Sequence, residues 1–342
     1  MSNQFDPNIY YSRQTVLAEI GHAGQKRLRE SRVAVVGLGG LGSISSLYLA
    51  LAGVGHLTLV DQDTVELNNL HRQALYSFSD IRHPKVEVAA DRLATLNPEV
   101  KIDAIADNVN EENVNSIIEN SNCVVDGLDN MYTRYLLNRH CVERQIPFVF
   151  GGAVGLEGNV AVFKTPETPC LECVLPGVDD STLPTCDTRG VLGATTGIIG
   201  SLQALETLKL LARVNQKIES RLMIFDFAES EFRSIELYVR RDCPVCQTKQ
   251  KPATVEKRLA WLCGSNTVNV NPEKPTALDL NGVIQVLQHK HRILLATPMV
   301  LVFDYNGHEV SIFKRGRMLI KNVETETEAL QLYLQIEKII RT

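Results

Sequence analysis

The 342-residue sequence has little of several features that mark whole classes of protein. Its formal charge of −5 leaves no basic excess, which argues against general nucleic-acid binding. No apolar run approaches the roughly 18 residues that a membrane-spanning helix needs, and the start "MSNQFDPNIY" lacks a secretion signal. We therefore expect a cytoplasmic protein that binds small molecules or proteins, and neither membrane nor nucleic acid.

The sequence also lacks internal repeats, low-complexity segments and the histidine spacing HExxH. A catalytic metal centre built from His71 or His83 is therefore not predicted. In a reducing compartment the eight cysteines are poor candidates for a disulfide framework. Metal binding, chemistry and core packing are the roles left for them.

From residue 33 to about 150 the chain alternates short apolar runs with helical patterns. The runs "VAVVG", "HLTLVD", "KIDAIA", "CVVDGLD" and "PFVFGG" predict parallel strands of a Rossmann-like, doubly wound α/β sheet. Residues 11–31 predict a preceding helix broken at Gly21, and residues 197–214 predict an amphipathic helix. The runs "LEGNVAVFK" and "LMIFDFAESEFRSIELYV" predict an antiparallel extension of the sheet.

A charged, proline-marked stretch at about 247–256 predicts a linker. We therefore divide the chain into a first domain, residues 1–250, and a small C-terminal αβ domain, residues 257–342. Within the latter, Asn306-Gly307 and Arg315-Gly316 predict turns between strands, and residues 326–340 predict a closing helix.

The stretch "VAVVGLGGLGS", Val33 to Ser43, predicts a phosphate-binding turn. The glycines of Gly37-x-Gly39-x-x-Gly42 allow a sharp turn and a close approach of the backbone to a phosphate at the N-terminal end of the following helix. Asp61, about 20 residues later, is placed to bind ribose hydroxyls. A nicotinamide cofactor and ATP fit this fingerprint equally well.

The next segment favours ATP. "VELNNLHRQ" supplies Asn68, Asn69, Arg72 and Gln73, and Lys85 follows at the start of a helix. Formation of an acyl-adenylate needs such cations, because attack of a carboxylate on the α-phosphate builds charge on phosphorus and on the departing pyrophosphate. Asp129 in "DGLDN" offers oxygen ligands for Mg²⁺ at the carboxyl end of a strand. Taken singly, Arg72 and Lys85 would be ordinary solvated cations.

Two CxxC pairs, Cys170-Leu-Glu-Cys173 and Cys243-Pro-Val-Cys246, lie about 70 residues apart. Four thiolates from two such turns suit a structural, tetrahedral Zn²⁺. Four unrelated thiols are the alternative, and a thioredoxin-like redox motif is disfavoured because neither pair lies between a strand and a helix of a βαβ unit.

Cys186 differs from these four. It lies in the polar loop "DDSTLPTCDTRGVLG", close to Arg189, and such surroundings can lower a thiol pKa and expose the thiolate to an activated acyl group. We expect Cys123, Cys141 and Cys263 to be core residues.

The segments "YSRQ", "GLGGLGS", "VDQDTVELNNLHRQ", "HPKVEVAADRLATLNP", "DGLDN" and "GIIGSLQALETLKLL", with the two CxxC pairs, resemble the MoeB/ThiF family of ubiquitin-activating-enzyme-like adenylyltransferases over about residues 10–248. The resemblance implies that Asp61 holds the ATP ribose, that Asn69, Arg72 and Lys85 contact phosphates, and that Asp129 holds Mg²⁺. It also places Zn²⁺ at the cysteines and implies a homodimer in which Arg13 reaches the neighbouring ATP site. The expected nucleotide site comprises Gly37, Gly39, Gly40, Gly42, Asp61, Asp63, Asn69, Arg72, Gln73, Lys85, Asp129 and Asn130.

The implied activity is ATP-dependent adenylylation of the C-terminal carboxylate of a ubiquitin-like or sulfur-carrier protein, typically ending Gly-Gly. A sulfur donor protein or Cys186 then attacks the activated carbonyl, so Arg13, Arg72, Lys85, Asp129 and Cys186 are the expected catalytic residues. Because the chain ends "KIIRT", we expect the carrier to be a separate protein.

Several alternatives stay open. Within the family, a peptide or tRNA-linked carboxylate could be the substrate; outside it, an NAD-dependent oxidoreductase or a catalytically silent scaffold fits the glycine loop. Some family members carry a fused sulfurtransferase domain, but Cys263 is the only cysteine past the linker and no Cys-x5-Arg loop follows it. Carrier docking and dimer support are the two hypotheses for residues 257–342. The pathway served by the carrier is not specified by the sequence.

Overall fold

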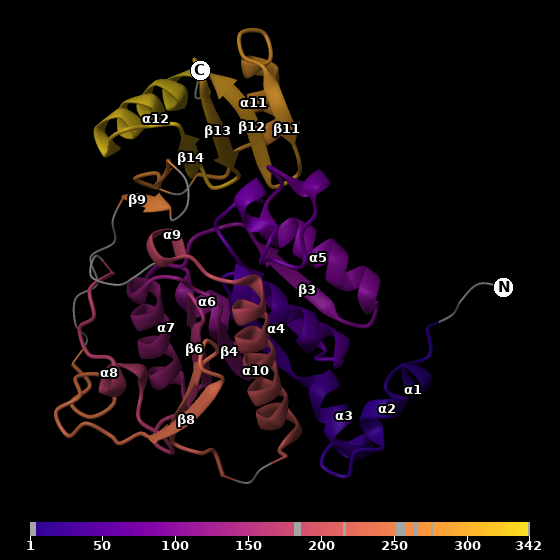
Figure 1. The fold of residues 1–342 in the computed structure, drawn as a ribbon. Helices are drawn as coiled ribbons and strands as arrows, with labels where there is room; N and C mark the ends of the chain where they lie inside the picture. Colours follow the sequence, from indigo (N-terminus) through magenta and orange to yellow (C-terminus); the bar gives the residue numbers. More distant parts are fainter. Residues whose placement is uncertain are drawn as a thin grey trace.

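A computed structural model describes residues 5–180, 186–214, 217–250, 258–262, 266–274 and 276–340; for Cys186, Asp187 and Leu262 it describes the backbone alone. The described residues form two separate β-sheets, one of eight strands and one of six strands. We call residues 5–250 the N-terminal unit and residues 258–340 the C-terminal unit. Figure 1 shows the C-terminal unit, in orange to yellow, stacked on one end of the N-terminal unit.

The N-terminal unit is built on five parallel strands in the order β3-β2-β1-β4-β5. The apolar residues of the four strands other than β3 are mostly buried, as expected for strands covered on both faces, whereas those of the edge strand β3 are only half-buried. This confirms the predicted doubly wound sheet. The strands are β1 (Arg32–Val36), β2 (His56–Val60), β3 (Lys101–Ile105), β4 (Cys123–Asp126) and β5 (Phe148–Val154).

Helices cover both faces of this sheet and bury a core on each. On one face lie α3 (Gly21–Glu30), α4 (Gly40–Leu51), α5 (Lys85–Leu96) and α10 (Gly193–Ala212); on the other lie α6 (Val114–Ile118) and α7 (Met131–Arg144). The expected break at Gly21 is present, with φ +55°, but two short helices precede it in place of one long helix. These are α1 (Pro7–Tyr10) and α2 (Ser12–Thr15), and two 3₁₀ turns, η1 (Leu67–Asn69) and η2 (Phe78–Asp80), lie between β2 and α5.

Three antiparallel strands extend the sheet beyond β5, as predicted: β6 (Glu157–Phe163), β7 (Arg221–Asp226) and β8 (Glu231–Glu236). Two short helices, α8 (Leu171–Val174) and α9 (Cys186–Arg189), lie between β6 and α10. The backbone at Cys186 is therefore helical, where the sequence predicted a loop.

The C-terminal unit is an antiparallel sheet in the order β11-β12-β13-β14-β10-β9, with two helices packed on one face. An Asn306-Gly307 turn with positive φ at both residues joins β12 to β13, as predicted from the sequence. Residues 251–257, which cover most of the predicted linker, and Cys263 lie outside the described residues. The elements are β9 (Leu259–Leu262), β10 (Thr267–Val270), α11 (Leu280–Leu287), β11 (Ile293–Ala296), β12 (Val300–Tyr305), β13 (His308–Phe313), β14 (Met318–Lys321) and α12 (Glu326–Ile340).

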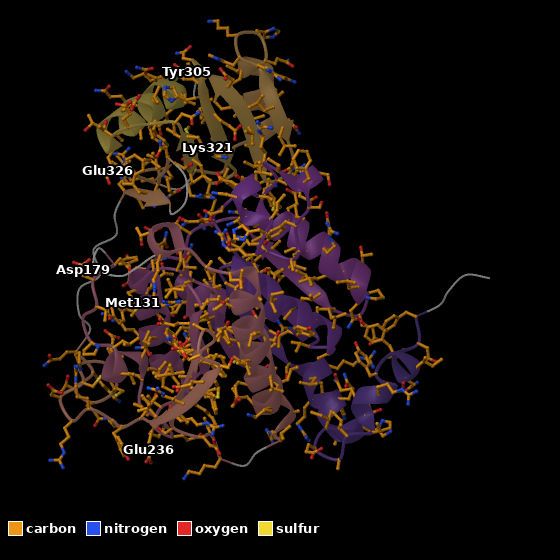
Figure 2. The ribbon with its side chains drawn as sticks, in the orientation of Figure 1. Met131, Asp179, Glu236, Tyr305, Lys321 and Glu326 are labelled. Atoms are coloured by element: carbon orange, nitrogen blue, oxygen red, sulfur yellow. The ribbon has the colours of Figure 1, made fainter. Side chains whose placement is uncertain are left out.

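The other face of the six-stranded sheet lies on the N-terminal unit. Its apolar residues Val300, Val302, Phe313 and Leu319 pack around Ala106, directly after β3. Lys321, labelled in Figure 2, lies on this side of the sheet, because its ammonium group is 2.8 Å from Glu66 of the N-terminal unit. None of the helices in the described ranges is long and apolar enough to cross a bilayer.

Candidate nucleotide site

A cavity of about 450 Å³ lies at the carboxyl ends of the parallel strands. Its walls include the loops after β1 and β4, which are neighbours in the sheet although they are not consecutive in sequence. The strand order reverses between these two strands. Open α/β sheets bind their ligands in the crevice at such a switch point.

The three loop glycines have different roles. Gly37 has φ +87°, and a Cβ on Gly42 would lie 1.8 Å from the Gly37 carbonyl oxygen, so these two glycines make the turn and let α4 approach it. A Cβ on Gly39 would meet nothing closer than Gln73 Nε2 at 3.9 Å. Gly39 lines the cavity at the N-terminus of α4, whereas Gly42 does not line it. The space beside Gly39 is where a phosphate would face the helix N-terminus.

Asp61 lies at the end of β2 and ties the glycine loop to the next segment. Its Oδ2 accepts a hydrogen bond from the Leu38 N–H (2.6 Å), and its Oδ1 accepts one from the Asp63 N–H (2.7 Å). Burial raises the pKa of Asp61 above the ordinary aspartate value, against the opposing charge of Lys85. Its position on the cavity wall is the one expected for an acid that binds ribose hydroxyls.

Lys85 begins α5 and forms an ion pair with Asp63, with 2.9 Å between Nζ and Oδ2. Burial lowers the pKa of Lys85, but the carboxylates of Asp63 and Asp61 outweigh it and leave the pKa raised. The other oxygen of Asp63, Oδ1, is buried and has no hydrogen-bond partner among the described residues. Such an atom is expected to pair with a ligand or with water.

The loop at η1 brings the remaining predicted polar residues to the same cavity. Asn69 is buried, with its Oδ1 accepting from the Glu66 N–H at 3.3 Å, and Arg72 donates to the Asn68 carbonyl oxygen at 2.6 Å. Gln73 is also buried, and its Oε1 has no hydrogen-bond partner in the described part of the chain. All three line the cavity.

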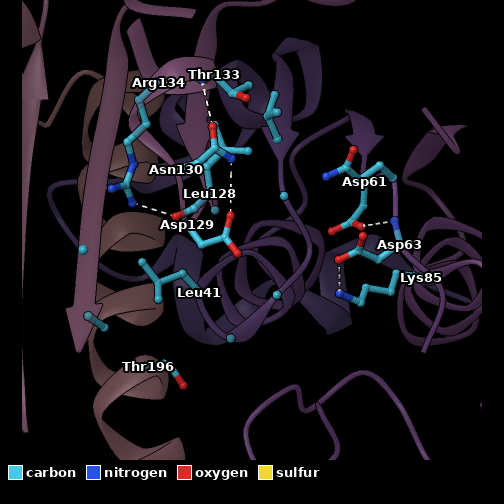
Figure 3. A pocket seen from close by; sticks show the side chains of 18 of the residues that line it. Leu41, Asp61, Asp63, Lys85, Leu128, Asp129, Asn130, Thr133, Arg134 and Thr196 are labelled. Carbon is cyan, nitrogen blue, oxygen red and sulfur yellow. Dashed lines mark hydrogen bonds and ion pairs between the residues drawn. The ribbon is translucent and has the colours of Figure 1, made fainter. Parts of the chain in front are cut away.

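Asp129 lies across the cavity from Asp61, Asp63 and Lys85, as Figure 3 shows. The turn that carries it is held by a buried ion pair between Asp126, at the end of β4, and Arg134 (2.9 Å). Arg134 also donates a hydrogen bond to the Leu128 carbonyl oxygen at 2.6 Å. Its contacts with Asp126 and Leu128 hold in place the backbone that directly precedes Asp129. Asn130 accepts a hydrogen bond from the Thr133 N–H and caps α7.

Two residues expected at the nucleotide and catalytic sites, Gly42 and Arg13, do not line the cavity. The side chain of Cys186 lies outside the described part of the chain. Arg13 is exposed on α2. Cys186 begins α9, three residues before Arg189, whose guanidinium pairs with the cavity residue Glu157.

Sequence reasoning missed several lining residues. Arg134 carried a weak signal, a cation shortly after a strand-end acid, whereas Thr267 and Leu319 carried none, since they come from the C-terminal unit.

Away from the cavity, the four predicted zinc cysteines form one cluster. Their ligand atoms lie within 4.8 Å of one another, with 3.6 Å between the sulfurs of Cys170 and Cys243 and 3.4 Å between those of Cys173 and Cys246. A Zn²⁺ ion with Zn–S bonds of about 2.3 Å needs sulfurs about 3.8 Å apart. The cluster therefore fits a tetrahedral ion.

The pKa values of two of these thiols, Cys173 and Cys243, are shifted in opposite directions by their surroundings. Burial raises the pKa of Cys173 to about 11. For Cys243 burial also acts to raise the pKa, but hydrogen bonds from the N–H groups of Cys246 and Val245, together with those to the Cys173 and Cys170 thiols, outweigh it and leave the pKa below the ordinary cysteine value. Amide donors of this kind stabilise a thiolate, the form that binds metal.

The glycine turn, the acid at the end of β2 and the cavity at the switch point define a Rossmann-like nucleotide-binding protein. The model of the ThiF family matches residues 11–245, and the chain belongs to this family. The resemblance stated from the sequence motifs is thereby confirmed. ATP use is expected for adenylyltransferases of this family.

Individual relatives agree with the family assignment. The chain is 44% identical over 238 residues to "Adenylyltransferase and sulfurtransferase MOCS3" of Culex quinquefasciatus, covering 69% of this chain and 54% of the relative. It therefore spans about half the length of that relative. It is 40% identical over 242 residues to "Sulfur carrier protein adenylyltransferase" of Thermus thermophilus, covering 69% and 89%. A crystal structure of E. coli MccB with ATP shares the fold, with a TM-score of 0.62, 22% identity, and 71% and 75% of the two chains covered.

Proposed function

We propose that this chain adenylylates the C-terminal carboxylate of a small sulfur-carrier protein with ATP. One observation carries the proposal: the glycine loop, Lys85, Arg72 and Asp129 surround a single cavity at the switch point. The names of the Culex and Thermus relatives describe this type of reaction. The family assignment supports ATP as the nucleotide.

The proposed binding mode follows the distribution of polar groups. The ribose binds at Asp61, the phosphates bind beside Gly39 and at the N-terminus of α4, and Asn69, Arg72, Gln73 and Lys85 contact the phosphate oxygens. Gly37, Gly40, Asp63 and Asn130 complete the walls, and Gly42 acts through packing.

In the proposed reaction, a carboxylate oxygen of the carrier's last residue attacks the α-phosphorus. The bond between the α-phosphorus and the bridging oxygen to the β-phosphate breaks, which leaves a carboxyl-adenylate and pyrophosphate. Lys85 and Arg72 provide fixed positive charge where negative charge grows. Because the Lys85 pKa is raised, its charge persists across the physiological pH range.

We also propose that Asp129 holds Mg²⁺. Its carboxylate is exposed on the cavity wall, and hard oxygen ligands of this kind are those that Mg²⁺ prefers. The ion would neutralise charge on the ATP phosphates.

We assign Zn²⁺ to the cluster of Cys170, Cys173, Cys243 and Cys246. With four sulfur ligands the ion has no open position, so its role is to fix α8 and its N-cap residue to the segment after β8. Reduced thiols are required for this site, which favours a cytoplasmic location.

We further propose a homodimer in which Arg13 reaches the neighbouring subunit's cavity. Apolar side chains exposed near the N-terminus, Ile9, Val16 and Leu17, support an interface there. Mixing Arg13→Ala and Asp129→Ala chains should then restore about a quarter of the wild-type activity, because half of the dimers carry one intact composite site. A mixture that stays inactive, with subunit exchange verified, would contradict the shared site.

Transfer of the acyl group to Cys186, or to a sulfur donor protein, stays a prediction. Cys186→Ala should leave adenylate formation unchanged and remove any thioester that survives without reductant. We propose residues 1–250 and 257–342 as two domains, of which the first carries out the adenylylation.

The decisive experiment measures carrier-dependent exchange of labelled pyrophosphate into ATP by the full chain with Zn²⁺ and Mg²⁺. Asp129→Ala should lower exchange about 100-fold or more. Asp103→Ala, which changes an exposed aspartate on β3, is the matched control and should not alter exchange. Absence of exchange by the wild-type chain with Gly-Gly-tailed carriers, or full exchange by Asp129→Ala, would refute the proposal.

A further inference from the structure

The six-stranded sheet of the C-terminal unit has two buried faces. On β14, Met318 and Ile320 point to the core under α11 and α12, as do Val268 and Val270 on β10. The alternate residues Arg317, Leu319 and Lys321, with Thr267 and Asn269, belong to the opposite face. At β10 and β14 this face carries polar and charged side chains beside its apolar cluster, yet Arg317, Thr267 and Leu319 are only 1%, 1% and 2% exposed, because the N-terminal unit covers them.

Arg317 links this face to the two loops that end β2 and β3. Its Nη2 donates to the carbonyl oxygen of Gln62 (2.7 Å) and approaches that of Ala106 (3.4 Å), and its Nη1 donates to Asn269 Oδ1 (3.0 Å). Its Nε lies 3.7 Å from Asp107 Oδ1. Burial lowers the pKa of Arg317 to about 10, against the attraction of Asp107, so the side chain is charged at neutral pH. A buried guanidinium in this position fixes both loops relative to the C-terminal sheet.

Two ion pairs between the C-terminal and N-terminal units hold the same two loops. Arg315 pairs with Asp107 at 2.9 Å, and Lys321 pairs with Glu66 at 2.8 Å. Glu66 directly precedes η1, and the Glu66 N–H is hydrogen-bonded to Asn69. The C-terminal unit therefore contacts both the segment from Asp61 to Arg72 and the loop after β3.

Thr267 and Leu319 reach the cavity itself. They line it together with Asp61, Gln62, Asp107 and Val109, at the side formed by the ends of β2 and β3. In doubly wound nucleotide-binding folds the ribose binds to the acid at the end of β2, so the nucleoside lies at this side and the phosphates lie toward the glycine loop.

We propose, building on the ATP-binding function proposed above, that the C-terminal unit supplies one wall of the nucleotide site. Thr267 and Leu319 contact the nucleoside, and Arg317 is a positioning residue that holds the loops after β2 and β3. The unit thus has a nucleotide-binding role that is separate from carrier docking and from dimer support.

The first test measures binding of ATP and of tripolyphosphate to the full chain by calorimetry. Leu319→Ala should weaken ATP about tenfold and change tripolyphosphate less than about twofold, since only ATP carries a nucleoside to pack on the wall. Leu301→Ala is the matched control, because Leu301 is buried in the same sheet on the side of α11 and α12 and lines no part of the cavity. It should leave both affinities within about twofold.

If Leu319→Ala bound ATP as tightly as the wild type, the proposal that the C-terminal unit forms a wall of the nucleotide site would be refuted. It would also be refuted if the variant lost affinity for ATP and for tripolyphosphate equally. If Leu319→Ala fails to fold, Leu319→Val serves with an expected loss of about threefold. A wild-type chain that binds no ATP would refute the proposed function itself, which is a different result from a variant that binds as well as the wild type.

The second test addresses Arg317 through kinetics of pyrophosphate exchange. Arg317→Met should raise the KM for ATP about tenfold with a nearly unchanged kcat, and Arg317→Lys should recover part of the loss, because a cation still reaches the carbonyl oxygens. A fall in kcat at constant KM would exclude the positioning role.

Discussion

The ammonium group of Lys85 lies 2.9 Å from the carboxylate of Asp63, and this pair is enclosed in the cavity wall beside Asp61. Only one Asp63 oxygen is used in the pair; the other has no hydrogen-bond partner in the described residues. A lysine held in this way has a fixed position and a persistent charge before any ligand arrives. Preorganised charge of this kind stabilises a transition state without the cost of reorienting solvent.

Replacement of Lys85 by methionine should lower pyrophosphate exchange about 100-fold. Because the pKa of Lys85 is raised in the folded protein, its charge should cause no inflection in the exchange rate between about pH 6 and 9. Lys101→Met, at an exposed position on β3, is the control and should behave as wild type.

The same substitution has a defined effect on stability. A raised folded-state pKa contributes stability that is fully present below the unfolded lysine pKa of about 10.4 and is lost as pH rises through the folded value. The difference in unfolding free energy between wild type and Lys85→Met should stay constant from about pH 7 to 9 and shrink above about pH 10.4. Denaturant titrations at each pH measure it, and a difference that already shrinks below pH 9 would exclude the raised pKa.

Gly39 and Gly42 should respond differently to the same change. In Gly42→Ala the new Cβ would lie 1.8 Å from the Gly37 carbonyl oxygen, so we expect a loss of more than about 3 kcal/mol of stability. In Gly39→Ala the Cβ enters open space next to the cavity, so the fold should be kept while ATP affinity falls about tenfold. Thermal unfolding and calorimetry separate these outcomes. Normal ATP affinity in a folded Gly39→Ala chain would mean that the phosphates bind elsewhere.

The parts of the site that could be predicted from sequence are those set by local chain geometry. Gly37, Gly39 and Asp61 occur at fixed offsets from buried strands, and the topology of a parallel sheet brings strand ends to one edge. The cysteine pairs were predictable for the same reason, since each CxxC turn presents two thiols to one point.

The contribution of the C-terminal unit could not be predicted in this way. Leu319 and Thr267 follow Asp61 by more than 200 residues, and no local pattern states which face of their sheet will meet the cavity. The alternation Arg317, Leu319, Lys321 does indicate a face that is not ordinary core, but its partner is set by tertiary packing. The helical backbone at Cys186 was also missed, because the polar and glycine-bearing sequence around it is typical of loops.

The ion pair between Asp126 and Arg134 should dominate the stability of the Asp129 turn. Burial raises the pKa of Asp126, against the charge of Arg134, and the carboxylate has no exposed surface. Arg134→Met leaves this charge unpaired and should cost about 3–5 kcal/mol of unfolding free energy. The loss should decrease on acidification, since an acid whose folded pKa is raised gains relative stability as pH falls below that pKa.

The double variant Asp126→Asn/Arg134→Met removes the charge along with its partner. It should regain about half or more of the lost stability, measured by denaturant unfolding. If the double variant were as unstable as Arg134→Met, the hydrogen bonds of Arg134 to Leu128 and Gly151 would be the main contribution, and the charge would be secondary.

The buried thiol of Cys123 and the four clustered cysteines should differ in their role in zinc binding, and Cys123 should resist alkylation. Burial raises the pKa of Cys123 to about 12, so at pH 8 only about 1 in 10,000 of these thiols is ionised and the native protein should not be alkylated there. Cys246→Ser should remove the bound Zn²⁺ and lower the melting temperature, whereas Cys123→Ala should keep about one Zn²⁺ per chain. Elemental analysis and mass spectrometry after alkylation measure both effects. Retention of stoichiometric zinc by Cys246→Ser, or rapid alkylation of Cys123 in the folded chain, would contradict the assignment, because the first result requires another ligand and the second requires an accessible thiolate.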